Sequence, residues 1–341
     1  MDTTVNSSVP LSVLMPVFNA EKYLQEAIES ILNQTFVDFE FIIINDGSTD
    51  GSKNIILSCS DSRIRYVENE TNLGLIPTLN KGLGLCSGKY IARMDADDIS
   101  LPDRLERQYR FMEKHPDIGV CGTWAKVIDA HNTVKGKIVN QTHPLFVSIH
   151  LLFSVPLAHP SCFIRTAILP KHPYREVPAA EDYDLWCRLN EGTRMANIPA
   201  FLLHYRWHES NVSNEQKQMQ EENKVQIIRR ELQKLHLNAD DAMLRIHRLS
   251  FLLHGFNQSE LIEKRPDDLP VTAQWFEQLL AANKQYKRYR HPAFVAYLWS
   301  RWIVLCLKRN EKRKMFRPSF ADFRPQVLYY LLQQGILLVK R

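Results

Sequence analysis

The sequence predicts an α/β protein with a mostly parallel central sheet and flanking helices, followed by a mainly helical region. Strand-like and helix-like segments alternate from Leu11 to Lys114, short connections join them, and strand patterns stop after about Asn214. Strands that alternate with helices in this way pair in parallel through right-handed crossovers. We therefore expect a sheet-containing domain over residues 1–214 and a helical region over residues 215–341.

The composition is that of a folded protein with a large core. The chain has 341 residues, of which 45% are hydrophobic and 24% charged. Its 12 Gly and 17 Pro exclude collagen-like and Pro/Gly-rich classes, and its 16 Phe, 12 Tyr and 6 Trp exclude intrinsic disorder. The six cysteines include no C-x-x-C pair, which favours free, buried thiols in a reducing compartment.

The first three elements follow from the spacing of apolar residues. Leu11–Val17 is a short apolar run that predicts a strand, and Asn19 after it is able to cap the next helix. Apolar residues recur at helical spacing within Ala20–Gln34. Phe39–Ile44 is rich in β-branched residues and apolar on both faces, which is typical of a buried parallel strand.

The same patterns continue along the chain. They predict, in order, a helix from about Asp50, a strand over Arg63–Glu68, a helix over Leu75–Leu85, a strand over Lys89–Met94 and a helix over Pro102–Lys114. Further strands are expected within Ile118–Val139, with a hairpin near His131 and Asn132. A polar helix is predicted over Glu215–Lys234.

No segment has the pattern of an export signal or a membrane span. Met1–Val9 contains no Lys or Arg, and no uninterrupted apolar run reaches the roughly 20 residues that a spanning helix needs. The nearest candidate, Ala293–Leu307, includes Ser300 and Arg301. We therefore expect a cytoplasmic protein that is not integral to a membrane.

Positive charge is concentrated toward the end of the chain. Eleven Lys and Arg residues and one acid, Glu311, fall between Lys284 and Arg317, on either side of and within the apolar segment Ala293–Leu307. A helix that is apolar on every side is either packed inside the protein or placed at a membrane interface. Basic flanks suit an anionic lipid surface, so peripheral attachment at the inner face of the cell membrane is the alternative to internal packing.

Polar residues follow three of the predicted strands, at the sheet edge where open α/β sheets bind ligands. They are Pro16–Asn19, Asn45–Asp50 and Asp95–Asp98. Turns and helix caps are sufficient to explain the first two clusters. The three carboxylates of Asp95–Asp98 repel one another, and a bound cation relieves that repulsion. Oxygen ligands of this kind suit Mg²⁺ or Mn²⁺, and the alternative is a solvated acidic turn.

Several other ligand-binding and nucleophile motifs are absent. The sequence has no G-x-G-x-x-G after the first strand, no G-x-x-x-x-G-K-[ST] and no G-x-S-x-G. A dinucleotide-binding Rossmann site, a P-loop and a serine-hydrolase elbow are therefore unsupported. Any recognition of phosphate must rely on a metal ion.

Short motifs follow one another over residues 10–213. They are P-V-F-N (16–19), F-E-F-I-I-I-N-D-G-S-T-D (39–50), N-L-G-L (72–75), D-A-D-D (95–98), L-P-D-R-L (101–105), A-H-P-S (158–161), E-D-Y-D-L-W (181–186) and Y-R-W-H-E-S-N-V-S (205–213). In residues and in order they resemble the motifs of family 2 glycosyltransferases, which have the GT-A fold. The family's usual D-D-G-S reads Asn45-Asp46-Gly47-Ser48 here, and the acid that contacts the nucleotide base is kept.

The resemblance implies an inverting transfer of a sugar from a nucleotide-sugar, with UDP as the expected nucleotide. The acceptor would be a hydroxyl of a glycan or lipid-linked saccharide, as in bacterial polysaccharide synthesis. The resemblance assigns the floor under the base and ribose to Pro16, Val17, Phe18 and Asn19, and a hydrogen bond from the base to Asp46.

The resemblance also implies a divalent metal, Mn²⁺ or Mg²⁺, at the acidic cluster. Asp95 or Asp97 would hold the ribose and approach the metal, and Asp97 and Asp98 are the expected carboxylate ligands. His208 resembles the family's late histidine, which ligates the metal or contacts the diphosphate. The alternative is a histidine with a structural role.

Glu181 and Asp182 are implied as the site of chemistry. Inverting transfer needs one carboxylate to take the proton of the attacking hydroxyl; Asp182 matches the family's base, and Glu181 orients or contacts the acceptor. Acids at the start of a helix over Tyr183–Leu189 would also favour the helix dipole, which is the alternative explanation. His159 and Arg165 lie in the segment expected near the acceptor, although buried hydrogen bonding explains His159 equally well.

Two other functions compete with a transferase. A GT-A protein that only binds nucleotide-sugar is disfavoured because Asp97, Asp98 and Asp182 are present. A nucleic-acid-binding protein would use the basic region but leave the acidic clusters without a purpose, so no nucleic acid is expected. The Q-x-x-R-W motif of processive synthases is absent, which favours the addition of one sugar per binding event.

Overall fold

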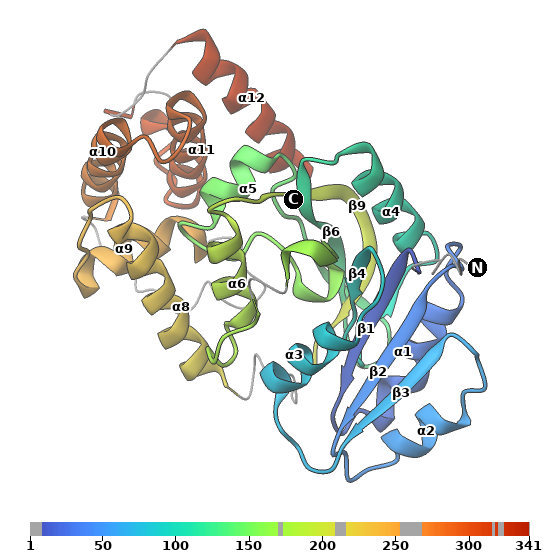
Figure 1. The fold of residues 1–341 in the computed structure, drawn as a ribbon. Helices are drawn as coiled ribbons and strands as arrows, with labels where there is room; N and C mark the ends of the chain where they lie inside the picture. The colour runs from blue at the N-terminus through green and yellow to red at the C-terminus, as the bar shows by residue number, and fades with distance from the viewer. Residues whose placement is uncertain are drawn as a thin grey trace, which may run out of the picture. The chain divides into compact units, whose positions relative to one another are not determined.

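Figure 1 shows a computed structural model of the chain. The structure describes residues 9–169, 173–208, 216–252, 268–315, 318–319 and 324–340. Three features named in the sequence analysis lie outside these residues. They are the segment before Val9, where no export signal is predicted, the motif positions 209–213, and Arg317 of the basic region.

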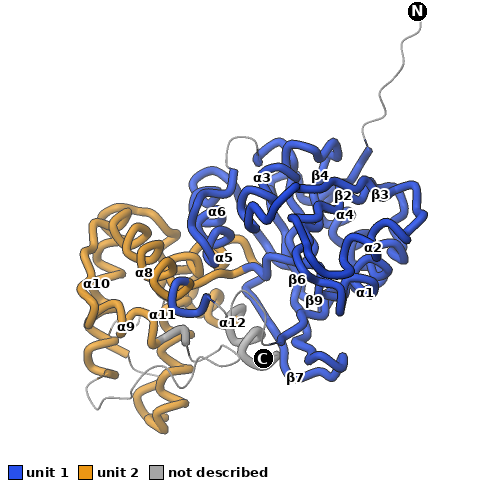
Figure 2. Tube along the Cα trace, turned by 90° about the horizontal axis from the view of Figure 1, so that it is seen from below, with its two compact units in different colours: residues 1–142, 157–219 blue, residues 143–156, 220–341 orange. Residues whose placement is uncertain are grey.

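The chain forms two compact units (Figure 2). Unit 1 comprises residues 1–142 and 157–219, and unit 2 comprises residues 143–156 and 220–341. The division into domains at residues 214 and 215 stays a prediction, because a compact unit is not by that fact a domain that folds alone. All six cysteines are free thiols.

Unit 1 is built on a sheet that has nine strands in the described residues. Their order is β3-β2-β1-β4-β8-β6-β9-β5, and β7 pairs with β6. The strands are β1 (Leu11–Val17), β2 (Glu40–Asp46), β3 (Ile64–Asn69), β4 (Tyr90–Arg93), β5 (Ile99–Ser100), β6 (Ile118–Ile128), β7 (Val134–Ile138), β8 (Phe163–Arg165) and β9 (Arg194–Arg206).

The first half of the sheet is parallel, as the alternating pattern predicts. β1 pairs in parallel with β2 and with β4, and β2 pairs in parallel with β3. Beyond β4 the sheet is mixed, because β8 runs antiparallel to β4 and β6 while β9 runs parallel to β6. The expected hairpin is the β6–β7 pair, with Asn132 at a φ of 61° in its turn. The carboxyl ends of β1, β2 and β4 meet at one edge, so the three predicted polar clusters lie together there.

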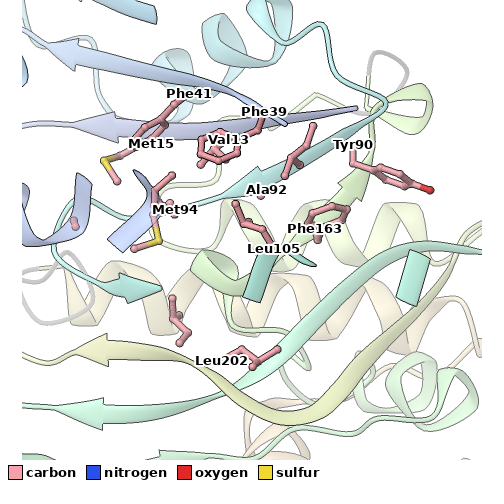
Figure 3. Packing of buried hydrophobic residues seen from close by; sticks show 14 of the residues in the cluster. Val13, Met15, Phe39, Phe41, Tyr90, Ala92, Met94, Leu105, Phe163 and Leu202 are labelled. Atoms are coloured by element: carbon pink, nitrogen blue, oxygen red, sulfur yellow. The ribbon is translucent and has the colours of Figure 1, made fainter. Parts of the chain in front are cut away.

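Helices cover both faces of the parallel part of the sheet. Those of unit 1 are α1 (Glu21–Leu32), α2 (Ser52–Ser58), α3 (Leu75–Leu85), α4 (Arg104–Lys114) and α6 (Glu181–Leu189), with 3₁₀ turns η1 (His159–Ser161) and η2 (Thr166–Ile168). Val13 and Phe41 belong to a core that also contains Leu105 of α4 (Figure 3). Leu24 of α1 is part of the same core. Leu14 lies on the other face, against α3. Because both faces are covered, β1 is buried along its whole length.

Unit 2 is helical in the residues that the structure describes. Its main helices are α5 (Pro144–His150), α8 (Lys217–Gln233), α9 (Asp241–Leu252), α10 (Asp268–Tyr286), α11 (His291–Lys308) and α12 (Pro325–Lys340), with a 3₁₀ turn η3 (Lys312–Lys314). No described helix combines the length and the apolar character that crossing a bilayer requires.

The apolar helix α11 is buried within unit 2. Its side chains Trp299 and Trp302 are buried, and their indole N–H groups donate to the backbone oxygens of Met315 and Lys314 at 3.0 and 2.8 Å. A buried indole whose N–H donates a hydrogen bond within the protein has its polar group satisfied without water or lipid. Internal packing therefore explains most apolar residues of this segment, although Leu307 at its end is exposed.

One close approach determines how β4 lies against β1. Gly88 precedes β4, and a Cβ atom there would lie 2.5 Å from the backbone nitrogen of Ser12 and 2.6 Å from the carbonyl carbon of Leu11. The N–H of Gly88 also donates to Ser12 Oγ at 2.9 Å. Since the crowding atoms belong to the backbone of a buried strand, no side chain can move to make room.

We expect Gly88→Ala to lower the free energy of unfolding by about 2–3 kcal/mol, because the added methyl group overpacks the contact between β1 and β4. The matched control is Gly84→Ala in α3, where a Cβ has open space and alanine improves helix propensity by up to about 1 kcal/mol. Urea denaturation measures both variants. Equal stability of the two variants would contradict the contact.

Candidate active site

Two loops at the carboxyl ends of β1 and β2 are joined by hydrogen bonds. Ser48 Oγ accepts the N–H of Asn19 at 3.0 Å, and Asn19 Oδ1 accepts the N–H of Thr49 at 2.9 Å. The prediction that Asn19 caps α1 is wrong: Ala20 occupies the cap position, and its N–H donates to Ser52 Oγ. Asn19 adopts a φ of 46°, which asparagine tolerates, and its side chain bonds the second loop instead.

The four residues predicted to form the floor under the base and ribose differ in their exposure to solvent. Pro16 and Val17 are buried at the end of β1, whereas Phe18 and Asn19 are exposed beyond it. Phe18 is 46% exposed, which is high for a large apolar side chain. Phe18 and Asn19 are therefore the two members of this cluster that can present their side chains to a ligand.

Asp46 is buried and ties the end of β2 to the N-L-G-L loop. Its Oδ1 accepts hydrogen bonds from Asn69 Nδ2 at 2.7 Å and from the Leu73 N–H at 2.9 Å. Its Oδ2 accepts the Gly74 N–H at 2.9 Å. These bonds use three of the roughly four acceptor positions of a carboxylate. The loop thus orients Asp46 and leaves it capacity for one more donor.

The carboxylates of Asp95, Asp97 and Asp98 each offer an oxygen, and these oxygens lie within 4.8 Å of one another. Two of the three have side-chain partners of different kinds. Asp95 forms an ion pair with Arg93, the last residue of β4. Asp97 Oδ2 lies 2.9 Å from His208 Nε2. The turn therefore combines a carboxylate held by a permanent cation with one held by an imidazole.

Asp98 is the buried member of the turn, with 1% of its surface exposed. Its Oδ1 accepts the backbone N–H of Arg206 at 2.8 Å, and its Oδ2 has no hydrogen-bond partner among the described residues. Burial, followed by the charges of Asp97 and Asp95, raises the pKa of Asp98 well above its usual value. A divalent cation would satisfy the orphaned oxygen and offset the repulsion. These residues therefore fit Mg²⁺ or Mn²⁺ better than a solvated acidic turn.

Arg206, at the end of β9, holds the D-A-D-D turn in place. Its buried guanidinium donates from Nε to the backbone oxygen of Asp97 at 2.7 Å, from Nη1 to Asn132 Oδ1 at 2.6 Å and from Nη2 to Glu26 Oε2 at 2.7 Å. These bonds join β9, the acidic turn, the β6–β7 turn and α1. The sequence motifs predict no role for Arg206, and the signal available in the sequence is an arginine that ends an otherwise mostly apolar strand.

Tyr23 of α1 packs against Arg206 and His208, the two residues at and just after the end of β9 that contact the acidic turn. The guanidinium carbon of Arg206 lies 4.4 Å from the centre of the Tyr23 ring, and the His208 ring centre lies 5.2 Å from it. These contacts bring His208 to Asp97, and the metal or diphosphate role that the resemblance implies for it stays a prediction. The same geometry serves both explanations for His208, because a hydrogen bond to Asp97 is structural and also leaves the ring beside the cluster.

Glu181 and Asp182 occupy the first turn of α6. Glu181 is buried, and its burial, followed by the charge of Asp182, raises its pKa to about 7. The start of α6 lies near the end of β4, because Arg93 donates its backbone N–H to the oxygen of Cys162 at 2.9 Å and Glu181 Oε1 lies 3.9 Å from Nδ1 of the nearby His159. Asp182 is partly exposed, and its Oδ1 accepts the N–H of Tyr183 at 2.6 Å. The pair thus stabilises the start of the helix and keeps one carboxylate accessible.

His159 belongs to a buried network beside Glu181. Its Nε2 lies 2.7 Å from Tyr174 Oη, and its Nδ1 lies 3.9 Å from Glu181 Oε1. Burial, together with the charge of Arg93, holds the pKa of His159 well below its usual value, so the ring is neutral at pH 7. Asn80 of α3 exchanges hydrogen bonds with the backbone N–H and oxygen of Tyr174. The segment predicted to lie near the acceptor is therefore fixed by buried hydrogen bonds.

Arg165 does not lie at this edge of the sheet, contrary to the expectation from its segment. Its guanidinium donates to the backbone oxygens of Ile118, Met112 and His115 and to Tyr90 Oη. Tyr90 begins β4, whereas the acidic turn follows its end. Because β8 runs antiparallel to β4 and pairs Arg165 with Tyr90, the strand carries Arg165 away from the site.

Sequence comparisons link this chain to proteins of one family. The profile of the family described as "Glycosyl transferase family 2" matches residues 12–166. The chain is 38% identical over 203 residues to the uncharacterized glycosyltransferase MJ1057 of Methanocaldococcus jannaschii, covering 58% of this chain and 70% of that protein. It is 37% identical over 205 residues to the O-antigen biosynthesis glycosyltransferase WbnJ of Escherichia coli, covering 58% and 80% of the two chains.

Solved structures with the same fold include TarS of S. aureus. The complex of TarS 1–349 with UDP-GlcNAc is 21% identical, covers 96% of this chain and 92% of that chain, and gives a TM-score of 0.55. The complex with UDP is 20% identical, has the same coverage and gives a TM-score of 0.53. This likeness confirms the predicted fold class, a GT-A α/β sheet with flanking helices and a helical C-terminal region. Since the family profile and the relatives match the segment that carries the predicted motifs, the chain belongs to glycosyl transferase family 2 and is a glycosyltransferase.

Proposed function

We propose that the protein is a metal-dependent, inverting glycosyltransferase. It moves the sugar of a nucleotide-sugar, with UDP as the expected nucleotide, to a hydroxyl of a glycan or lipid-linked saccharide. The observation that carries this proposal is that the site contains two separate acidic groups. One is the D-A-D-D turn with the orphaned Oδ2 of Asp98, and the other is the accessible Asp182 at the start of α6. The first suits the departing nucleotide, and the second suits the attacking hydroxyl.

The donor end is supported by the joined loops. The remaining acceptor capacity of Asp46 suits an N–H of the nucleotide base, and Phe18 and Asn19 lie exposed at the neighbouring strand end. Asp95 or Asp97 would hold the ribose. TarS has been solved with UDP and with UDP-GlcNAc, which makes UDP-sugars the first donors to test.

The metal would be held by Asp97 and Asp98 together with His208. Asp98 offers a buried oxygen that no described residue satisfies, and Asp97 and His208 lie at the same turn. When bound, Mn²⁺ or Mg²⁺ supplies positive charge that stabilises the diphosphate as it leaves.

Asp182 would act as the general base. It accepts the proton of the acceptor hydroxyl while that oxygen forms a bond to the anomeric carbon of the sugar. The bond from the anomeric carbon to the diphosphate oxygen breaks, and its electron pair stays on the diphosphate. A single displacement of this kind inverts the anomeric configuration. Glu181 and His159, which are held in a buried network, would border the acceptor.

The site favours neither competing function. A protein that only binds nucleotide-sugar needs no accessible carboxylate at the start of α6. Binding of nucleic acid depends on neutralising its phosphates with cations, whereas this edge of the sheet presents a cluster of acids.

Donor binding is expected to require Mn²⁺ or Mg²⁺. Combining Asp97→Asn with Asp98→Asn should abolish the metal-dependent part of donor affinity, because both carboxylate ligands become neutral amides. A thermal-shift screen of nucleotide-sugars, with and without Mn²⁺, finds the donor, and calorimetry measures its affinity. The control Asp103→Asn removes an acid that pairs with Arg107 at the surface. Donor affinity that is unchanged in EDTA would contradict the metal site.

Asp182→Asn is expected to lower turnover by about 10²–10⁴-fold, since an amide keeps the shape of the carboxylate but cannot take a proton. Donor affinity should barely change, because this group acts on the acceptor side. Release of UDP from the donor found in the screen measures turnover, and calorimetry on the same variant measures binding. Turnover within a few-fold of the unaltered chain, or a parallel loss of donor binding, would show that Asp182 is not the base.

We also propose that unit 2 attaches the enzyme peripherally to the inner face of the cell membrane. Most apolar residues of α11 are buried, although Leu307 at its end is exposed, so the contact would be made by α12. On that helix Leu328, Tyr329 and Leu332 are 41%, 58% and 73% exposed, and their spacing places them on one face. Basic residues of η3 belong to the same unit, which suits anionic lipid headgroups.

Replacing Leu328, Tyr329 and Leu332 together by Gln is expected to reduce binding to phosphatidylglycerol vesicles at low salt. Binding of the unaltered chain should weaken as salt rises, because salt screens exposed charges. Vesicle sedimentation measures both effects. The control Val37→Gln changes an exposed apolar residue of unit 1. A full-length chain that ignores these vesicles at low salt would rule out membrane attachment through this helix.

A further inference from the structure

Arg93 is a buried cation close to both acidic groups of the active site. Its side chain is 6% exposed and forms the ion pair with Asp95. Its charge also acts on Asp98 and on Glu181, where it partly offsets the rise in pKa that burial causes. The Nε of Arg93 is buried and has no hydrogen-bond acceptor among the described residues. A buried donor without a partner costs free energy of folding, which is typical of a group kept for function.

The ion pair with Arg93 distinguishes Asp95 from the other two carboxylates of the D-A-D-D turn. Asp95 is engaged by Arg93, while Asp97 and Asp98 lie beside it with oxygens close enough to share one ion. With Arg93 present, the charge of Asp95 is offset, and a divalent cation would offset the charges of Asp97 and Asp98. If Asp95 were released, three carboxylates would compete for the same ion. Each additional carboxylate ligand would occupy a coordination position that the diphosphate needs.

We propose that Arg93 is a positioning residue that keeps Asp95 from ligating the metal, so that Asp97 and Asp98 hold the ion and leave it open to the diphosphate. This inference rests on the proposed function, because it concerns the proposed metal site. It requires that loss of Arg93 has opposite effects on two ligands. The metal alone should bind more tightly, and the nucleotide should bind more weakly.

The test uses the full chain and the variant Arg93→Met, which keeps much of the apolar volume and removes the charge. We expect Mn²⁺ alone to bind about tenfold more tightly, since a nearby positive charge is lost and Asp95 is freed. We expect UDP at saturating Mn²⁺ to bind about tenfold more weakly, since the additional carboxylate competes with its phosphates. Electron paramagnetic resonance of Mn²⁺ and calorimetry with UDP measure the two affinities without any assay of turnover.

Two further variants separate the role of Arg93 from damage to the fold. Arg93→Met combined with Asp95→Asn replaces the buried ion pair by neutral groups, which proteins often tolerate. This double variant should bind Mn²⁺ about as tightly as the unaltered chain, within about threefold, because Asp97 and Asp98 are intact. The control Arg107→Met removes one positive charge from an exposed pair and should leave both affinities unchanged.

The outcomes distinguish this inference from the function on which it rests. An unaltered chain that binds no Mn²⁺ would overturn the proposed metal site itself. Mn²⁺ affinity that is present in the unaltered chain but unchanged or weaker in Arg93→Met would overturn the role of Arg93 alone. If Arg93→Met fails to fold, the double variant decides: Mn²⁺ affinity more than about tenfold below that of the unaltered chain would mean that Asp95 is itself a ligand.

Discussion

The position of the acidic turn depends on the guanidinium and the backbone N–H of Arg206. The D-A-D-D turn follows β4 and carries three carboxylates that repel one another, so hydrogen bonds from outside the turn must hold it. Arg206 provides them to the backbone oxygen of Asp97 and to Asp98 Oδ1, and it anchors itself on α1 and on the β6–β7 turn. Loss of this arginine would release the turn from its neighbours, even though Arg206 lies outside the predicted ligand set.

The two sides of the active site differ in their electrostatic surroundings. At the D-A-D-D turn, Arg93 and His208 each engage one carboxylate, and Asp98 keeps an oxygen that no described residue satisfies. At the start of α6, burial raises the pKa of Glu181 to about 7, and it keeps the neighbouring His159 neutral at pH 7. The excess of negative charge therefore lies at the D-A-D-D turn, where we propose that a cation and a diphosphate bind.

Unit 2 shows why the sequence of an apolar helix with basic flanks does not reveal whether the helix lies in a protein core or at a membrane interface. The composition of α11 suits both a membrane interface and a protein core. The indole hydrogen bonds of Trp299 and Trp302 to residues near η3 show that unit 2 itself buries this helix. Three of the large apolar residues that remain exposed in unit 2 share a face of α12, a later segment whose charge pattern did not single it out.

The sequence by itself determined the fold class, the order of the elements up to β7 except for the short strand β5, and the location of the polar clusters. Apolar periodicity is a local property, and parallel pairing brings the ends of β1, β2 and β4 to one edge whatever the details of packing. Motif order also identified the family from residues 10–213. The tertiary structure alone decided which partner each polar group has. Asn19 bonds a loop rather than its own helix, Arg165 is carried away by the direction of β8, and Asp98 is held by Arg206 from 108 residues along the chain. Such partners depend on packing between segments distant in sequence, which no local pattern records.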